Sequence, residues 1–308
     1  MNYSFDKLTQ DLKDIKIQGS SQIAKITLET LGQLILKKNY SESADIFFDY
    51  ATLKNKLLRI RPTEPMLENG FYFLEKHWPK NQNLLSLKKE INKVIRKYLF
   101  LINRNQEKII KFSNNLIKNQ EKIFTHCHSS LVEKILTAAK KSGKFFSVYN
   151  TETRPLFQGR ITAKNLIRNQ IKTTLVADSA AGFLISHYSG RELMMDKVII
   201  GADAIYWDGS VVNKIGSFGI GLAAYHEQVP LYITTTLLKL DRDNKIKIEI
   251  REKKEIWPQA PKKLKIINFA FDLVPAKFIT GIICEFGIIR PSQVKDLVEK
   301  NYPWLLKK

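Results

Sequence analysis

The amino-acid sequence predicts an α/β protein in which a helical N-terminal domain is followed by a Rossmann-like, doubly wound parallel sheet. Up to about Lys118, apolar residues recur at helical spacing. From about Glu121, short apolar runs alternate with helical stretches, which is typical of a parallel sheet. A chain of 308 residues, 44% of them hydrophobic, is also long and apolar enough to bury the cores of two domains.

The first domain is expected over residues 1–118. Helical periodicity is clear in IAKITLETLGQLIL and again in LLSLKKEINKVIRKYLFLI. The segment between them, RIRPTEPMLENG, carries two prolines and a glycine and predicts a turn or loop. The Lys-, Asn- and Gln-rich run 103–122 is expected to continue as a polar-faced helix that bridges to the second domain.

The second domain is expected over residues 119–308. Five strands are predicted, at KIFTHC, KFFSVYNTE, TTLVAD, KVIIGAD and VPLYITT. Helices are predicted between them, in SSLVEKILTAAKK, TAKNLIRNQ, SAAGFLISHY and NKIGSFGIGLAAYH. The charged segment 237–261 predicts an excursion with an edge hairpin, and INFAFDLVP then returns to the core. Two further helices are predicted at the end, in KFITGIICEFG and PSQVKDLVEK.

The composition narrows the possible functions. The net charge of +20 attracts anions, but the Lys residues are dispersed, which favours solvated helix faces over a nucleic-acid partner. Two cysteines imply no disulfide framework, and no G-x-G-x-x-G follows the first strand, so no dinucleotide or other cofactor is expected. A polar N-terminus and the lack of an apolar run of transmembrane length predict a cytoplasmic chain with no membrane partner.

Polar or reactive side chains follow several of the predicted strands. Because ligands of open α/β sheets bind beyond the carboxyl ends of the strands, these side chains predict a site at that edge. A single aspartate at a strand end would be only a helix cap. The groups concerned are His126-Cys127-His128, Glu152-Thr153-Arg154, Asp178-Ser179 and Asp203.

Cys127 is the most reactive of these candidates. It precedes a predicted helix, whose N-terminal dipole is expected to lower the pKa of the thiol, and protonated His126 and His128 would lower it further. A second interpretation is a buried structural cysteine, which is how Cys284 in GIICEFG is read. A third is a metal site made by Cys127 and its two histidines, but adjacent residues point apart and no metal is expected.

The other candidates are an acid and several anion-binding groups. Asp203 in GADAI has small neighbours that let a ligand approach, and it can serve as acid or base or simply cap a turn. Asn213 and Lys214 are placed at the head of a helix, where they suit a phosphate or an enolate oxygen. Arg61 and Arg154 lie in loops with proline, where each is either a phosphate clamp or a salt-bridge partner.

Taken together, these segments resemble the translation initiation factor 2B alpha/beta/delta-like superfamily, which also contains sugar-phosphate isomerases. The resemblance covers the chain from Arg61 to about Glu285 and implies a helical N-terminal domain, a Rossmann-like C-terminal domain and assembly as homodimers or homohexamers. The matching strings, in family order, are RPTEPM, THCHSS, ETRPLFQGR, VADSAAG, IGADAI, VVNKIG and FDLVP.

The resemblance also implies an enzyme, because the isomerases carry Cys in the THC motif and Asp in the GAD motif. The implied reaction converts ribose 1,5-bisphosphate to ribulose 1,5-bisphosphate in nucleotide salvage. Asp203 would handle oxygen-bound protons, Cys127 would exchange the carbon-bound proton through an enolate, and Lys214 would stabilise negative charge. Two alternatives remain: a 5-methylthioribose 1-phosphate isomerase, or a non-catalytic regulatory protein of the initiation-factor type.

The sequence departs from the isomerase pattern at two places. Gln18 stands in Gln18-Gly19-Ser20-Ser21 where the enzymes carry the Arg of an Arg-Gly-Ala-type motif, and His128 replaces the Asn usual after the cysteine. Lys16 or Arg59 is a candidate replacement for the missing charge. The residues expected to bind the substrate and its phosphates are Gly19, Ser20, Arg61, Ser129, Arg154, Gln158, Asn213 and Lys214.

Overall fold

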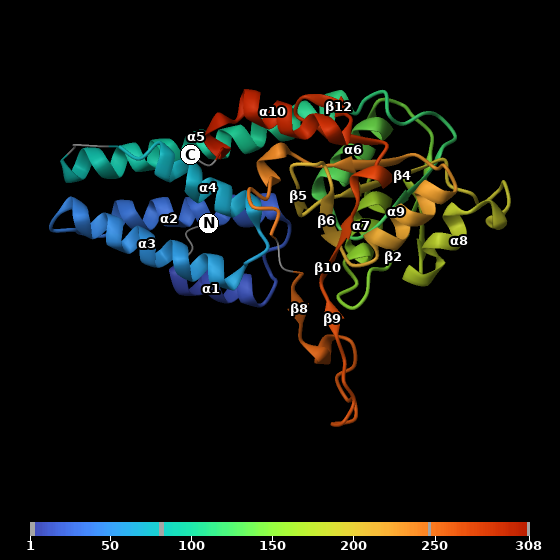
Figure 1. Cartoon of the computed structure of the whole chain (residues 1–308), viewed down its shortest axis with the longest axis horizontal. Helices are drawn as coiled ribbons and strands as arrows, with labels where there is room; N and C mark the ends of the chain where they lie inside the picture. Colours follow the sequence, from blue (N-terminus) through green and yellow to red (C-terminus); the bar gives the residue numbers. More distant parts are fainter. Residues whose placement is uncertain (1–3, 80–82, 246–247, 307–308) are drawn as a thin grey trace.

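The computed structural model describes residues 4–79, 83–245 and 248–306. Residues 1–3, 80–82, 246–247 and 307–308, which belong to the two predicted domains, lie outside the described residues. The N-terminal helices lie at one end of an elongated molecule and the central sheet at the other (Figure 1). The predicted fold class, helices followed by a largely parallel α/β sheet, is confirmed.

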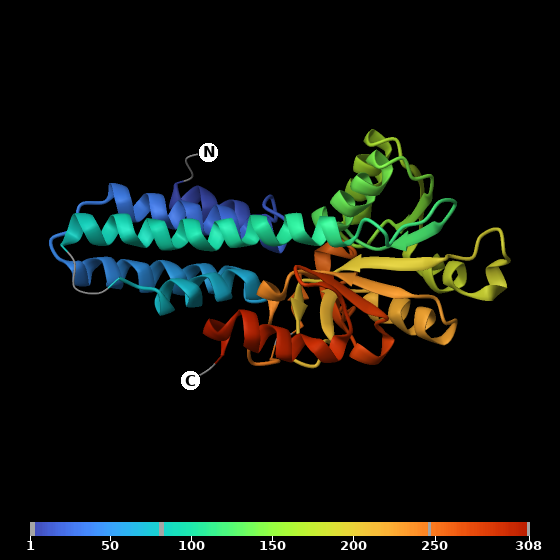
Figure 2. The same cartoon turned by 90° about the horizontal axis from the view of Figure 1, so that it is seen from above.

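The N-terminal segment is helical because its apolar residues recur every three or four positions. One long helix runs the length of this segment to the sheet (Figure 2), so it joins the two ends of the molecule. It ends at Phe112, so the prediction of a helix continuing to residue 122 is wrong. The helices are α1 (Phe5–Lys13), α2 (Ser20–Lys37), α3 (Ser43–Ile60), α4 (Pro65–Lys76) and the long α5 (Leu84–Phe112).

The central sheet contains all five predicted strands. Within the described residues it has seven strands in the order β12-β11-β7-β4-β1-β2-β3. Strand β12 (Gly287–Ile289) is antiparallel to its neighbour β11 (Gly281–Cys284), and the other pairs are parallel. The predicted strands are β1 (Lys122–Thr125), β2 (Ser147–Thr151), β3 (Lys172–Val176), β4 (Lys197–Gly201) and β7 (Leu231–Thr234).

Helices cover both faces of this sheet. In β4, Ile199 packs with the apolar side chains of α6 (Ser130–Lys141) and α7 (Gln158–Arg168), while Val198 and Ile200 pack with those of α8 (Ala181–Ile185) and α9 (Ser217–His226). Successive residues of a strand point to opposite faces, so this alternation makes the sheet doubly wound. The final helix is α10 (Val294–Asn301). No helix of the described residues is long and apolar enough to span a membrane.

One predicted helix is wrong, and a second begins later than predicted. KFITGIICEFG forms a 3₁₀ turn and β11 (Gly281–Cys284), and its last residue begins β12 (Gly287–Ile289), because a short apolar run fits a fully buried strand as well as a helix. In the second, Asn213 and Lys214 belong to strand β6 (Val211–Lys214), and α9 begins only after Gly216, whose φ of 105° suits glycine.

The remaining strands form two small sheets. Strand β6 pairs in antiparallel fashion with β5 (Ala204–Ile205) and β10 (Phe271–Val274). The predicted excursion contains β8 (Ile250–Arg251), whose antiparallel partner β9 (Asn268–Phe269) lies beyond residue 261, so the hairpin is longer than expected. It projects from the body of the molecule in Figure 1.

Candidate active site

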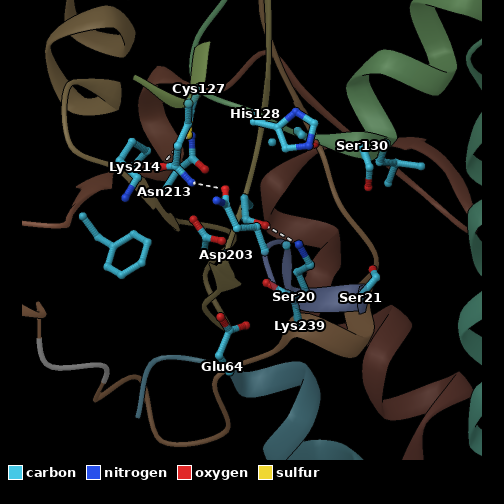
Figure 3. A pocket seen from close by; sticks show the side chains of 18 of the residues that line it. Ser20, Ser21, Glu64, Cys127, His128, Ser130, Asp203, Asn213, Lys214 and Lys239 are labelled. Atoms are coloured by element: carbon cyan, nitrogen blue, oxygen red, sulfur yellow. Dashed lines mark hydrogen bonds between the residues drawn. The ribbon is translucent and has the colours of Figure 1, made fainter. Parts of the chain in front are cut away.

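A cavity lies at the carboxyl ends of β1 and β4, where the helical segment meets the sheet. Figure 3 shows Cys127, Asp203, Asn213 and Lys214 around one space, with Ser20 and Glu64 on its other side. Of the predicted site residues, Arg154 alone does not line this cavity. Those that line the cavity are Gly19, Ser20, Arg61, Cys127, Ser129, Gln158, Asp203, Asn213 and Lys214.

The turn after β1 holds Cys127 in a fixed and unusual conformation. Its φ of 65° lies in the left-handed region, which few side-chain-bearing residues adopt. The backbone N–H of Cys127 donates to Thr153 Oγ1 at 3.0 Å, and Thr162 Oγ1 donates to its carbonyl oxygen at 3.0 Å. Because these hydrogen bonds come from the loop after β2 and from helix α7, the surrounding fold holds the conformation of this turn and so the position of the sulfur.

The expected low pKa of Cys127 is wrong. Burial raises the pKa of the thiol to about 12, the charge of Lys214 lowers it, and the charge of Asp203 raises it. The residue that caps α6 is Ser129, two positions later, so the thiol is not itself at the helix N-terminus. In the resting site the thiol is therefore neutral, and its Sγ–H donates to Gln158 Oε1 at 3.6 Å.

The two neighbouring histidines have structural partners. His126 is buried between Thr151 Oγ1 at 2.6 Å and the carbonyl of Ile215 at 2.9 Å, and burial lowers its pKa, so it does not supply the charge expected from the sequence. His128 Nδ1 lies 2.8 Å from Glu133 Oε1. No group of three His, Cys, Asp or Glu residues that could hold a metal ion is present in the described ranges.

Asp203, Asn213 and Lys214 are placed by the small sheet of β5, β6 and β10. The backbone N–H of Asp203 donates to the carbonyl of Val212 at 2.8 Å, which joins the end of β4 to β6. Asn213 Nδ2 donates to Ser217 Oγ at 2.9 Å, and Lys214 Nζ lies 4.8 Å from the ring centre of Phe271. Strand β6 therefore places the amide of Asn213 and the ammonium of Lys214 at the same cavity as the carboxylate of Asp203.

Asp272 stabilises the turn that follows Lys214 and gives the fold a pH dependence. Its Oδ2 accepts from the N–H of Gly216 at 2.7 Å, and burial raises its pKa to about 6 from 3.8. Between these two values the folded state binds more protons than the unfolded state, so the contribution of Asp272 to stability falls as pH rises through this window.

The Asp272→Asn protein lacks this titration. Relative to the unaltered protein, its free energy of unfolding should rise by up to roughly 3 kcal/mol as pH increases from 4 to 7. Urea unfolding at several pH values measures the difference, and a difference that does not change with pH would contradict the role of Asp272.

Two helix N-termini meet at the cavity. Gly19 caps α2 with a φ of 81°, and the buried Oγ of Ser20 has no hydrogen-bond partner among the described residues. Ser129 caps α6, and Ser130 also lines the cavity. Since the N-terminus of a helix offers free N–H groups and a partial positive charge, both ends suit an anion such as phosphate.

Three further predicted binding residues, Arg61, Gln158 and Arg154, have different contacts, and only the first two line the cavity. Arg61 lines the cavity and pairs with Glu64, Nη2 to Oε1, at 2.8 Å. Gln158 Nε2 donates to Gln18 Oε1 at 3.0 Å, so Gln18 orients the amide that contacts Cys127. Arg154 lies outside this cavity because its guanidinium donates to the carbonyl of Ile256 at 3.3 Å.

Sequence reasoning missed four charged residues of the cavity wall, which are Glu64, Lys239, Glu249 and Arg251. Glu64 is buried there and Lys239 is half-buried, and Lys239 Nζ donates to the carbonyl of Ala202 at 2.6 Å. The one available signal was the position of Glu64 within the RPTEPM loop, three residues after Arg61. Lys239 lies in a segment that reads only as charged and irregular.

Comparison with known proteins identifies the class. The Initiation factor 2 subunit family model matches residues 16–291, and the chain belongs to that family. The ribose 1,5-bisphosphate isomerase of Methanocaldococcus jannaschii is 32% identical, covering 97% of this chain and 95% of that protein. The methylthioribose-1-phosphate isomerase of Acetivibrio thermocellus is 30% identical, covering 96% and 90%. The expectation of an isomerase is confirmed.

A solved structure supports the same fold. The Pyrococcus horikoshii OT3 translation initiation factor eIF-2B superposes with a TM-score of 0.80, covering 95% of this chain and 99% of that one, at 24% identity. At this identity the likeness establishes the fold alone. The same fold thus occurs in a protein named as a translation factor, so the fold does not identify the substrate, and the argument about substrate rests on the cavity.

Proposed function

We propose that this chain converts ribose 1,5-bisphosphate to ribulose 1,5-bisphosphate by proton transfer through an enolate. The observation that carries the proposal is the meeting of Cys127, Asp203 and Lys214 in one cavity that also receives the N-termini of α2 and α6. An acid–base pair, a cation and two anion-binding helix ends are the groups that isomerisation of a phosphorylated sugar requires.

The reaction moves a hydrogen from C2 to C1 of a sugar whose anomeric oxygen is blocked by phosphate. Cys127 first passes its thiol proton to Asp203, and the thiolate then takes the proton from C2 while Asp203 protonates the ring oxygen as the ring opens. Asp203 next accepts the proton of the enol hydroxyl, and Cys127 returns its proton to C1. Lys214 has two roles. Its charge lowers the pKa of Cys127 against the larger effect of burial, and it stabilises the negative charge of the enolate.

The phosphates are assigned to the two helix ends. The N-termini of α2, at Gly19 and Ser20, and of α6, at Ser129, supply N–H groups from different parts of the chain. Two separate anion-binding ends favour a bisphosphate over a monophosphate. The ribose 1,5-bisphosphate isomerase of Methanocaldococcus jannaschii is a relative over nearly the whole chain, which supports the same choice.

A second candidate substrate is 5-methylthioribose 1-phosphate. One observation favours it: Gln18 is uncharged and Arg61 is paired with Glu64, so the wall near α2 and α4 offers little net positive charge to a second phosphate. The Acetivibrio thermocellus relative carries the corresponding name.

Ligand-induced stabilisation tests the proposed substrate class. Ribose 1,5-bisphosphate at about 100 times its Kd should raise the free energy of unfolding by about 2.7 kcal/mol, with 5-methylthioribose 1-phosphate and an RNA oligonucleotide as comparators. Stabilisation by the RNA alone, with steep loss as salt is added, would instead support a translation-factor role.

A further inference from the structure

Arg61 and Glu64 form an incomplete ion pair on the wall of the candidate active site. A single contact of 2.8 Å joins Nη2 of Arg61 to Oε1 of Glu64. Nε of Arg61 and Oε2 of Glu64 are buried, and neither has a hydrogen-bond partner within the described residues. Two-point pairing between a guanidinium and a carboxylate would have satisfied both atoms. The single contact leaves one donor and one acceptor for whatever enters the cavity.

Glu64 is buried among other charged groups of the cavity. Glu64 is 5% exposed, and burial raises the pKa of its carboxyl group. The charge of Arg61 lowers this pKa, the charge of Asp203 raises it, and the charge of Lys239 lowers it. In Figure 3 its carboxylate lies on the same side of the cavity as Lys239, with Asp203 above it. An additional negative charge at Arg61 would therefore meet two carboxylates already present.

We propose that Glu64 is a resident counter-ion of Arg61 and takes up one proton when an anionic group of the substrate binds there. The anion replaces Oε1 on the guanidinium, a proton from solvent bonds to the carboxylate, and the resulting carboxyl donates a hydrogen bond to the anion. This inference rests on the proposed function only in that the phosphate assigned to the N-terminus of α2 also contacts Arg61, which lines the same cavity. Glu64 is then a specificity-determining residue, since it makes dianion binding depend on proton uptake.

Calorimetry with sulfate tests this coupling without any assay of isomerisation. Sulfate remains a dianion near neutral pH, so any proton taken up on binding is taken up by the protein and released by the buffer. Titration in two buffers that differ in ionisation enthalpy gives the number of protons. At pH 7.5 we expect uptake close to one proton per sulfate for the unaltered protein and close to zero for Glu64→Gln. The variant should also bind sulfate about tenfold more tightly, the change equivalent to one pKa unit.

The matched control is Glu90→Gln, which neutralises a carboxylate of an exposed ion pair, 3.3 Å from Lys93 on α5. It should leave both the proton count and the sulfate affinity unchanged. Weaker sulfate binding by Glu64→Gln, an unchanged proton count, or no sulfate binding by either protein would overturn the inference. The count on the unaltered protein needs no variant, so misfolding of Glu64→Gln would not remove the test.

The two proposals fail in different ways. If sulfate binding takes up a proton through Glu64 but no sugar phosphate is isomerised, the proposed function is wrong and the role of Glu64 stands. If isomerisation occurs and the Michaelis constant for the sugar phosphate changes no more between pH 6.5 and 8 in the unaltered protein than in Glu64→Gln, the role of Glu64 is wrong and the proposed function stands.

Discussion

Replacing Cys127 with serine is expected to lower kcat for isomerisation by about 10²–10⁴-fold, the usual contribution of a positioned acid–base group. The hydroxyl of serine is a far weaker acid than a thiol, so it cannot exchange a carbon-bound proton at a comparable rate. The hydrogen bonds that position this residue involve its backbone N–H and carbonyl, and these survive the change. The substitution thus alters the chemistry and leaves the geometry in place.

The matched control is Cys284→Ala, because Cys284 is the second buried cysteine and lies within β11. This variant should keep kcat and lose a little stability from the smaller side chain. A steady-state assay under saturating substrate compares the proteins, with far-ultraviolet circular dichroism to verify folding. Full activity in Cys127→Ser would remove Cys127 from the proposed chemistry.

Glu285 is expected to give the largest change in stability. Its Oε1 accepts hydrogen bonds from Asn105 Nδ2 at 3.0 Å, Thr236 Oγ1 at 3.0 Å and Tyr302 OH at 2.7 Å, and all four residues are buried. These partners come from α5, from the segment after β7 and from the segment after α10, so one carboxylate ties the helical segment to the sheet. Thr236 also lines the candidate active site.

Glu285→Ala leaves several buried donors without an acceptor, each costing about 1–3 kcal/mol, so unfolding should become easier by roughly 3 kcal/mol or more. Glu285→Gln retains one acceptor oxygen and should cost less. Urea unfolding at pH 7 gives the values, with Glu299→Ala on the exposed face of α10 as control. A Glu285→Ala protein as stable as that control would show that the network contributes little.

The sequence was sufficient to predict the order of the main elements. The five strands lie in short apolar runs that end in polar groups, and this local pattern survives folding. It failed at KFITGIICEFG, since a run of apolar residues has the same composition in a buried strand and in a helix. It also failed at Asn213 and Lys214, because their strand forms by pairing with residues about sixty positions later.

Burial was the property of the site that could not be predicted. The pKa of Cys127 depends on how many atoms surround the sulfur, and those atoms come from several distant loops. The helix dipole and the neighbouring histidines suggested a reactive thiolate at Cys127, whereas desolvation has the larger effect on the pKa of its thiol. Glu64 and Lys239 were missed for the same reason, since a charged residue in a sequence reads as exposed until the fold encloses it.

The central claim is that the cavity around Cys127 and Asp203 isomerises ribose 1,5-bisphosphate. The most direct measurement is ³¹P and ¹³C nuclear magnetic resonance of the purified chain incubated with this substrate, and in parallel with 5-methylthioribose 1-phosphate. We expect signals of ribulose 1,5-bisphosphate to appear, and to be absent with Asp203→Asn. No ribulose 1,5-bisphosphate, with or without added nucleotides, would contradict the claim, and product from 5-methylthioribose 1-phosphate alone would support the second candidate substrate instead.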